Sequence, residues 1–158
     1  MTMRTAIGML AALAPLAAGA SSPPALRLPE KELASEAYEY VNRTRELPDD
    51  VRRGLARQLG QDELEMADAG APFSSTDVIT EPALPGYRLI LAAVGPRYSV
   101  VHFERGGIAL VRRVVVFGKG AAGMSVLWDG AVSKAYPQAK DLEGAIRSGT
   151  LWRPAARP

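Results

Sequence analysis

The side chains best suited to chemistry lie in one predicted strand, around the only histidine of the chain, His102. Successive side chains of a strand point to opposite faces, so His102 and Glu104 share a face. If the next turn closes a loop of two or four residues, Arg113 joins them, whereas a three-residue loop with a bulge brings Arg112 instead. Such a set could serve a hydrolase or lyase, with His102 as general acid–base and Glu104 orienting its ring. The residues could equally form an ordinary cross-strand polar cluster, which is the interpretation that we favour.

A second motif consists of Gly118, Gly120 and Gly123, which stand in the spacing G-x-G-x-x-G after an apolar run. It resembles the fingerprint of flavin- and NAD-binding proteins, whose glycines let the backbone approach a pyrophosphate at a helix N-terminus. Residues 125–130 read as strand and turn rather than helix, and only 35 residues follow the motif, too few for a nucleotide-binding half. We therefore interpret the three glycines as a hairpin connection and expect no dinucleotide or other cofactor.

Cysteine is absent from the sequence, which excludes disulfides, thiolate zinc sites and cysteine nucleophiles. One histidine and no cysteine also make a zinc site improbable, so we expect no metal.

Charge is distributed unevenly along the chain. Residues 30–81 include 13 acidic and 6 basic residues, whereas residues 82–158 include 4 acidic and 11 basic ones. The pattern favours two solvated faces of opposite sign, and the alternative is a basic C-terminal half that binds an anionic polymer. Nucleic acid is not the expected partner, because no run of basic residues is longer than two and aromatic residues are few.

The N-terminal residues have the three-part pattern of a secretory signal peptide. Arg4 precedes an apolar run over residues 7–18, and Ala18-Gly19-Ala20 is a small-x-small cleavage site. The run is too short for a membrane span, which needs about 17 to 25 residues. We expect cleavage after Ala20, a Pro-rich leader over residues 21–29, no membrane span in the mature chain, and a periplasmic or secreted location.

The remaining pattern predicts one α+β domain over residues 30–152, followed by a disordered tail at residues 153–158. Its architecture is N-terminal helices packed on a four-stranded antiparallel β-meander, with a short C-terminal helix. The expected helices cover residues 30–47, 49–59, 62–66 and 138–148. The expected strands cover residues 87–94, 98–104, 108–117 and 124–128, with a turn at Asp129-Gly130.

The strand expected at residues 108–117 is mostly apolar on both faces, so it should be central and covered on each side. The N-terminal helices can supply one cover, and the C-terminal helix or a partner the other. The sequence thus favours a small exported, non-enzymatic binding or inhibitor-type module for a protein or an envelope component, with Tyr98, Arg112 and Arg113 as candidate contact residues. The alternatives are a hydrolase or lyase that uses His102 and Glu104, and anionic-polymer binding.

Overall fold

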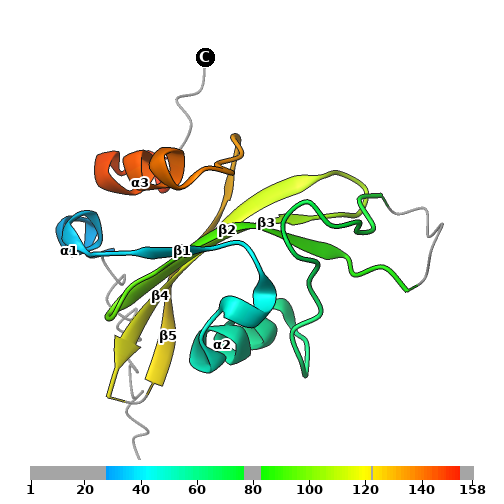
Figure 1. Ribbon diagram of the computed structural model, residues 1–158, viewed down its shortest axis with the longest axis horizontal. Coiled ribbons are helices and arrows are strands. Elements are labelled where there is room, and N and C mark those ends of the chain that lie inside the picture. The colour runs from blue at the N-terminus through cyan, green and yellow to red at the C-terminus, as the bar shows by residue number, and fades with distance from the viewer. Residues whose placement is uncertain (1–27, 77–82, 122, 154–158) are drawn as a thin grey trace, which may run out of the picture.

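The computed structural model describes residues 28–76, 83–121 and 123–153 (Figure 1). The predicted signal peptide, most of the predicted leader and most of the predicted tail lie outside these ranges. The elements, in chain order, are α1 (Glu30–Ser35), β1 (Glu39–Val41), the 3-10 helix η1 (Thr44–Glu46), α2 (Asp49–Leu59), β2 (Tyr87–Val94), β3 (Tyr98–Arg105), β4 (Val111–Gly120), β5 (Gly123–Val132) and α3 (Ala139–Ser148).

The strands form one antiparallel sheet in the order β1-β2-β3-β4-β5. This confirms the α+β class and the predicted meander, but the prediction of four strands was one short. The missing strand, β1, pairs with the end of β2, where Val41 lies opposite Ala92. The spacing of residues 39–41 predicts a helix, and only this long-range pairing makes them a strand.

The predicted helix over residues 30–47 is therefore wrong beyond its first six residues. Its backbone leaves the helix at Glu36, which has φ −68° and ψ 143°. The carboxylate of Glu36 accepts a 2.7 Å hydrogen bond from the backbone nitrogen of Arg97 and two more from its guanidinium. Burial alone would raise the pKa of Glu36, but these hydrogen bonds and the charge of Arg97 outweigh it and lower the pKa. Together these contacts hold Glu36 in an extended conformation.

Local signals placed the other helices more accurately. α2 begins at Asp49, and Gly60 directly follows its last residue, as Gly149 follows that of α3; both glycines have the left-handed conformation typical of helix C-termini. The predicted helix at residues 62–66 is absent. The chain bends at residues 62–63, and the side-chain amide of Gln61 forms hydrogen bonds with the backbone nitrogen and carbonyl of Glu65. The chain then continues to a parallel bridge between Ala67 and Arg88.

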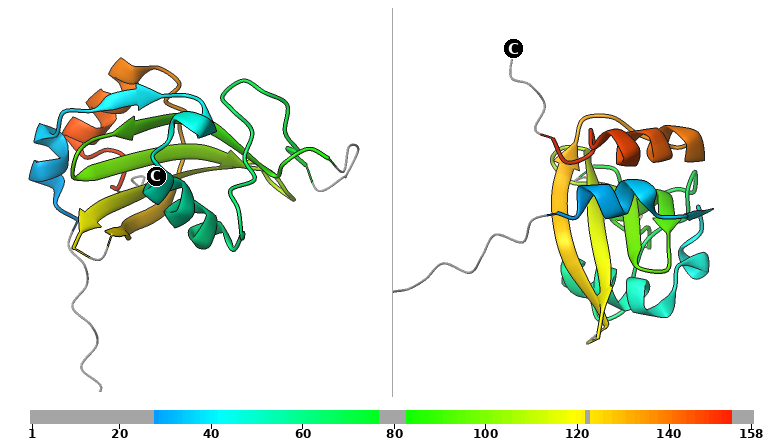
Figure 2. Two further views of the ribbon diagram at one scale, coloured as in Figure 1. Left: turned by 60° about the horizontal axis from the view of Figure 1, so that its bottom comes forward. Right: turned by 90° about the vertical axis from the view of Figure 1, so that its left-hand side faces the viewer.

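Helices cover both faces of the sheet, and the two N-terminal helices lie on opposite sides (Figure 2). α2 packs on one face, in a core that includes Val51, Leu55 and Phe117. α1 and α3 pack on the other, in a core that includes Leu33, Val114 and Leu142. The expectation that β4 is central and covered on each side is thus met within the chain, and its second cover does not require a partner.

The bounds of β4 and β5 differ from the prediction by more than one residue. β4 begins at Val111 rather than at Ile108, so residues 106–110 form the loop between β3 and β4. β5 continues to Val132 through the predicted turn, and Gly130 pairs with Val114 of β4. At that point the ladder hydrogen bonds of β4 outweigh the local turn preference of Asp129-Gly130.

Candidate functional site

The predicted acid–base pair lies on the face of the sheet that α1 and α3 cover. His102 sits in the middle of β3, between Leu91 of β2 and Val114 of β4, and none of its surface is exposed. Its Nδ1 donates a 2.9 Å hydrogen bond to the carbonyl of Arg113, while Nε2 is buried with no hydrogen-bond partner among the described residues. The ring of Tyr136 packs edge-on against the imidazole, with 5.7 Å between the two ring centres.

Burial lowers the pKa of His102, against smaller opposing effects of the Arg113 carbonyl and the Glu104 charge. The imidazole is therefore neutral at pH 7. A neutral ring with a free Nε2 has the chemistry of a general base, but a base must come within hydrogen-bond reach of the proton that it removes. Since no atom of the side chain is exposed, a substrate has no access to it in this conformation.

Glu104 is the centre of an ion-pair ladder across three strands, in register with Arg88 of β2 and Arg112 of β4. Its Oε2 accepts hydrogen bonds from Arg88 Nη2 at 2.6 Å and Nε at 3.2 Å, and its Oε1 lies 3.3 Å from Arg112 Nε. The Arg88 guanidinium also lies 4.3 Å from the ring centre of Phe73. Glu104 is only 5% exposed and its two partners are partly buried, so the ladder joins β2, β3 and β4 just before the β3–β4 loop.

Arg113 lies on the opposite face. Its Nη2 donates a 2.7 Å hydrogen bond to Asp129, which also accepts one from Gln58 of α2 at 2.6 Å. Of the two arrangements considered from the sequence, the structure shows the one with Arg112 beside Glu104. The reason is the loop between β3 and β4, whose odd number of residues sets Glu104 opposite Arg112.

The three predicted contact residues do not share one surface. Tyr98 is at the start of β3, where the Arg97 guanidinium lies 5.3 Å from its ring centre, whereas Arg112 pairs with the other end of that strand. Arg113 projects from the other face.

The glycine motif lies within one antiparallel strand pair. Gly118 and Gly120 belong to β4, Gly123 begins β5, and Gly120 pairs directly with Gly123. Gly123 has φ 99°, which glycine adopts without strain. The motif is thus followed by a strand, whereas a dinucleotide-binding turn is followed by a helix.

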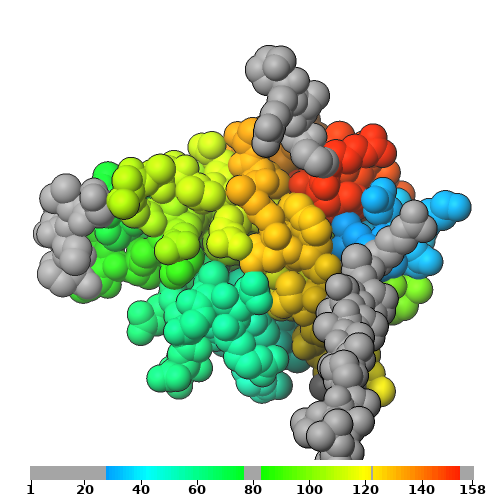
Figure 3. Space-filling view, turned by 180° about the vertical axis from the view of Figure 1, so that it is seen from behind, coloured from blue at the N-terminus to red at the C-terminus, as the bar shows by residue number. Residues whose placement is uncertain are grey.

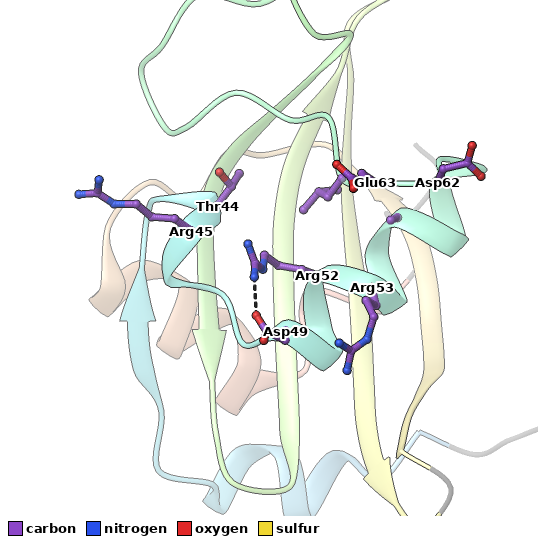
Figure 4. Close-up of a pocket in the computed structure, with 9 residues that line it drawn as sticks. Thr44, Arg45, Asp49, Arg52, Arg53, Asp62 and Glu63 are labelled. Carbon is purple, nitrogen blue, oxygen red and sulfur yellow. Dashed lines mark hydrogen bonds and ion pairs between the residues drawn. The ribbon is translucent and has the colours of Figure 1, made fainter.

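A hollow of about 440 Å³ lies beside α2 (Figure 4). Six charged residues of both signs line it: Arg45, Arg52, Arg53, Asp49, Asp62 and Glu63. Arg52 forms an ion pair with Asp49, while Arg45, Arg53 and Asp62 point away from one another (Figure 4). Because the charges balance and do not converge, the hollow selects no class of ligand.

A more distinctive feature is the β3–β4 loop. Ile108 is 96% exposed and Leu110 43%, and these are the exposed large hydrophobic side chains in the described part of the chain. The loop lies at one end of the long axis of the molecule, away from α1 and α3 (Figure 1). The sequence pattern does not reveal this exposure, because the apolar residues 108–110 read as the start of the following strand. The preceding Gly106-Gly107 indicates a turn, but it does not indicate at which residue the following strand begins.

The loop backbone is held at its base. Gly106 donates a 2.9 Å hydrogen bond to the carbonyl of Gly86, and Ser74 donates one of 2.9 Å to the carbonyl of Pro85. A Cβ atom on Gly106 would overlap the backbone of Ser74, so only glycine allows the two segments to pack this closely. With the Glu104 ladder behind it, the loop is displayed on a fixed base.

Within residues 28–76, 83–121 and 123–153, no group of three or more acidic or histidine side chains could hold a metal ion. None of the helices in these ranges is both long and apolar enough to cross a membrane. Comparisons of the chain with protein-family models, with curated proteins and with solved structures found no match.

Proposed function

We propose that this chain is a small exported protein without catalytic activity of its own, which binds another protein or an envelope component through the β3–β4 loop. The observation that carries the proposal is the exposure of Ile108 at the end of a braced hairpin. Full burial of such a side chain contributes about 1.5–3 kcal/mol. A partner that buries Ile108 therefore gains free energy that the isolated protein does not, because its side chain remains in water.

The fixed base of the loop supports this proposal. A binding element that is already held in place loses little conformational entropy when it binds, and more of the contact energy then appears as affinity. Gly106 and the Glu104 ladder supply this preorganisation.

The two alternative functions have less support. A hydrolase or lyase that uses His102 would require the buried ring to become accessible. Anionic-polymer binding by the C-terminal half would require free basic side chains, but five of its arginines are engaged with carboxylates within the chain: Arg88, Arg97, Arg112, Arg113 and Arg147.

Photo-crosslinking in cells that export the protein tests the proposal. A benzophenone amino acid replaces Ile108 in one variant and Lys140, an exposed residue of α3, in a matched control. We expect a defined adduct from position 108 and none from position 140, with unchanged melting temperatures. Identical patterns from the two positions, or no adduct from either, would contradict binding through this loop.

A further inference from the structure

We propose that the component bound by the β3–β4 loop is the surface of an anionic phospholipid membrane, which Ile108 and Leu110 enter while nearby arginines bind lipid phosphates. This inference rests on the proposed function and narrows its partner to one class.

The first argument is the size and shape of the loop. A stable protein–protein interface takes about 800 Å² from each partner and 20–30 residues on each side. The apolar tip consists of two side chains in a loop of residues 106–110. The yellow-green segment that includes this loop lies away from α1 and α3 (Figure 3). So narrow an apolar projection is too small for such an interface, but it can enter a fluid lipid surface, which adapts to its shape.

The second argument is the charge around the tip. Arg105 is exposed and has no carboxylate partner among the described residues, while Arg88 and Arg112 share the single charge of Glu104. Asp129 balances Arg113. This end of the described hairpin thus carries an excess of positive charge next to its apolar side chains. When the apolar tip enters a membrane, basic groups beside it lie at the level of the lipid phosphates, which attract them in an anionic leaflet.

The third argument is a hollow of about 400 Å³ beside the tip. Arg105 and Arg113 line it together with Ile108, Ala109 and Val111. Asp129 holds the guanidinium of Arg113, so the free guanidinium at this hollow is that of Arg105. Guanidinium groups pair well with phosphate oxygens, and the apolar wall beside Arg105 suits the start of an acyl chain. An amphipathic anion such as a phospholipid matches both parts.

Vesicle sedimentation with the chain purified from the exported fraction tests the inference. The probes are vesicles of equal parts phosphatidylglycerol and phosphatidylcholine, and vesicles of phosphatidylcholine alone. We expect at least about tenfold stronger partition onto the anionic vesicles, because each basic residue near an anionic surface contributes about fivefold. Equal partition onto the two kinds of vesicle would overturn the inference.

Three variants separate the contributions. Ile108→Ser should reduce anionic-vesicle binding about tenfold, the loss expected from an aliphatic side chain that no longer enters the membrane. Arg105→Glu should reduce it at least about fivefold. Lys140→Glu makes the same change of charge on α3 and should leave binding within about twofold. Equal effects of Arg105→Glu and Lys140→Glu would show that only net charge matters and would overturn the proposed site.

Soluble glycerol phosphate, added in excess as a competitor, distinguishes the membrane from its headgroup. Vesicle binding should persist, because the competitor lacks the apolar phase that the tip enters; complete displacement would overturn the membrane as the occupant. Adducts of position 108 with a protein, without vesicle binding, would overturn the inference but leave the proposed function. The absence of both would refute both.

Discussion

Replacing Glu104 with glutamine tests whether the three-strand ladder stabilises the sheet. The substitution keeps the shape of the side chain and removes its charge. Arg88 and Arg112 then stay at 29% and 34% side-chain exposure without a counter-ion, and the amide can accept a hydrogen bond from only one of its ends.

The expected cost follows from burial. Removing one member of a fully buried ion pair costs about 3–5 kcal/mol, and a hydrogen bond to a charged group contributes about 1.5–3 kcal/mol. Both arginines reach solvent, which screens part of the lost attraction. We therefore expect Glu104→Gln to lower the free energy of unfolding by about 2 kcal/mol.

Urea unfolding, followed by far-UV circular dichroism, measures this change. The dependence of the unfolding free energy on urea concentration should be the same for the variant and the unmodified protein, so that only the midpoint shifts. Glu143→Gln is the matched control, because Glu143 pairs with Arg147 at 2.8 Å on the surface of α3, where both side chains are about half exposed. Such an i,i+4 surface pair contributes only about 0.3–0.5 kcal/mol. If the two variants lose the same stability to within about 0.5 kcal/mol, burial does not strengthen the ladder and the reasoning is wrong.

Three further outcomes are expected. Because burial lowers the pKa of His102 in the folded state, stability should decrease as the pH falls below the unfolded value of 6.5, and thermal melts between pH 7.5 and 5 should show a smaller decrease for His102→Phe. Gly106→Ala should lower the free energy of unfolding by more than about 2 kcal/mol, because the new Cβ atom would overlap the backbone of Ser74. At Gly107 a Cβ atom has open space, so Gly107→Ala should cost only the strain of a φ of 138°, about 1 kcal/mol. Chemical denaturation measures both variants, and equal losses would contradict the tight packing at the loop base. Mass spectrometry of the exported protein should find a mature chain that begins at Ser21, and a chain that retains residues 1–20 would contradict the predicted cleavage.

Local patterns predicted a large part of the fold. The residues of β2 were predicted to the residue, because an apolar run bounded by glycine and proline leaves little choice. α2 and α3 end just before Gly60 and Gly149 as expected, since a left-handed glycine after an apolar helical stripe is a local stop signal. Short connections with glycine also predicted the hairpins of the meander.

The candidate site was predicted less completely. Strand alternation placed His102 and Glu104 on one face, but it could not choose between Arg112 and Arg113, because that choice depends on the loop length. The exposure of Ile108 was not predicted, because an apolar residue next to a strand is normally assigned to it. In the structure, the pairing of β4 with β3 begins with Val111 opposite Arg105, so Ile108 lies in the loop before β4.

The sequence by itself determined the class of the fold, the order of the meander and the positions where two helices stop, because these depend on contacts within a few residues. The tertiary structure decided that residues 39–41 form a strand, that His102 is fully buried, and that helices cover both faces of the sheet. Each of these depends on pairing or packing between segments far apart in the chain, and the ion pair of Glu36 with Arg97, 61 positions away, ends the first helix for the same reason.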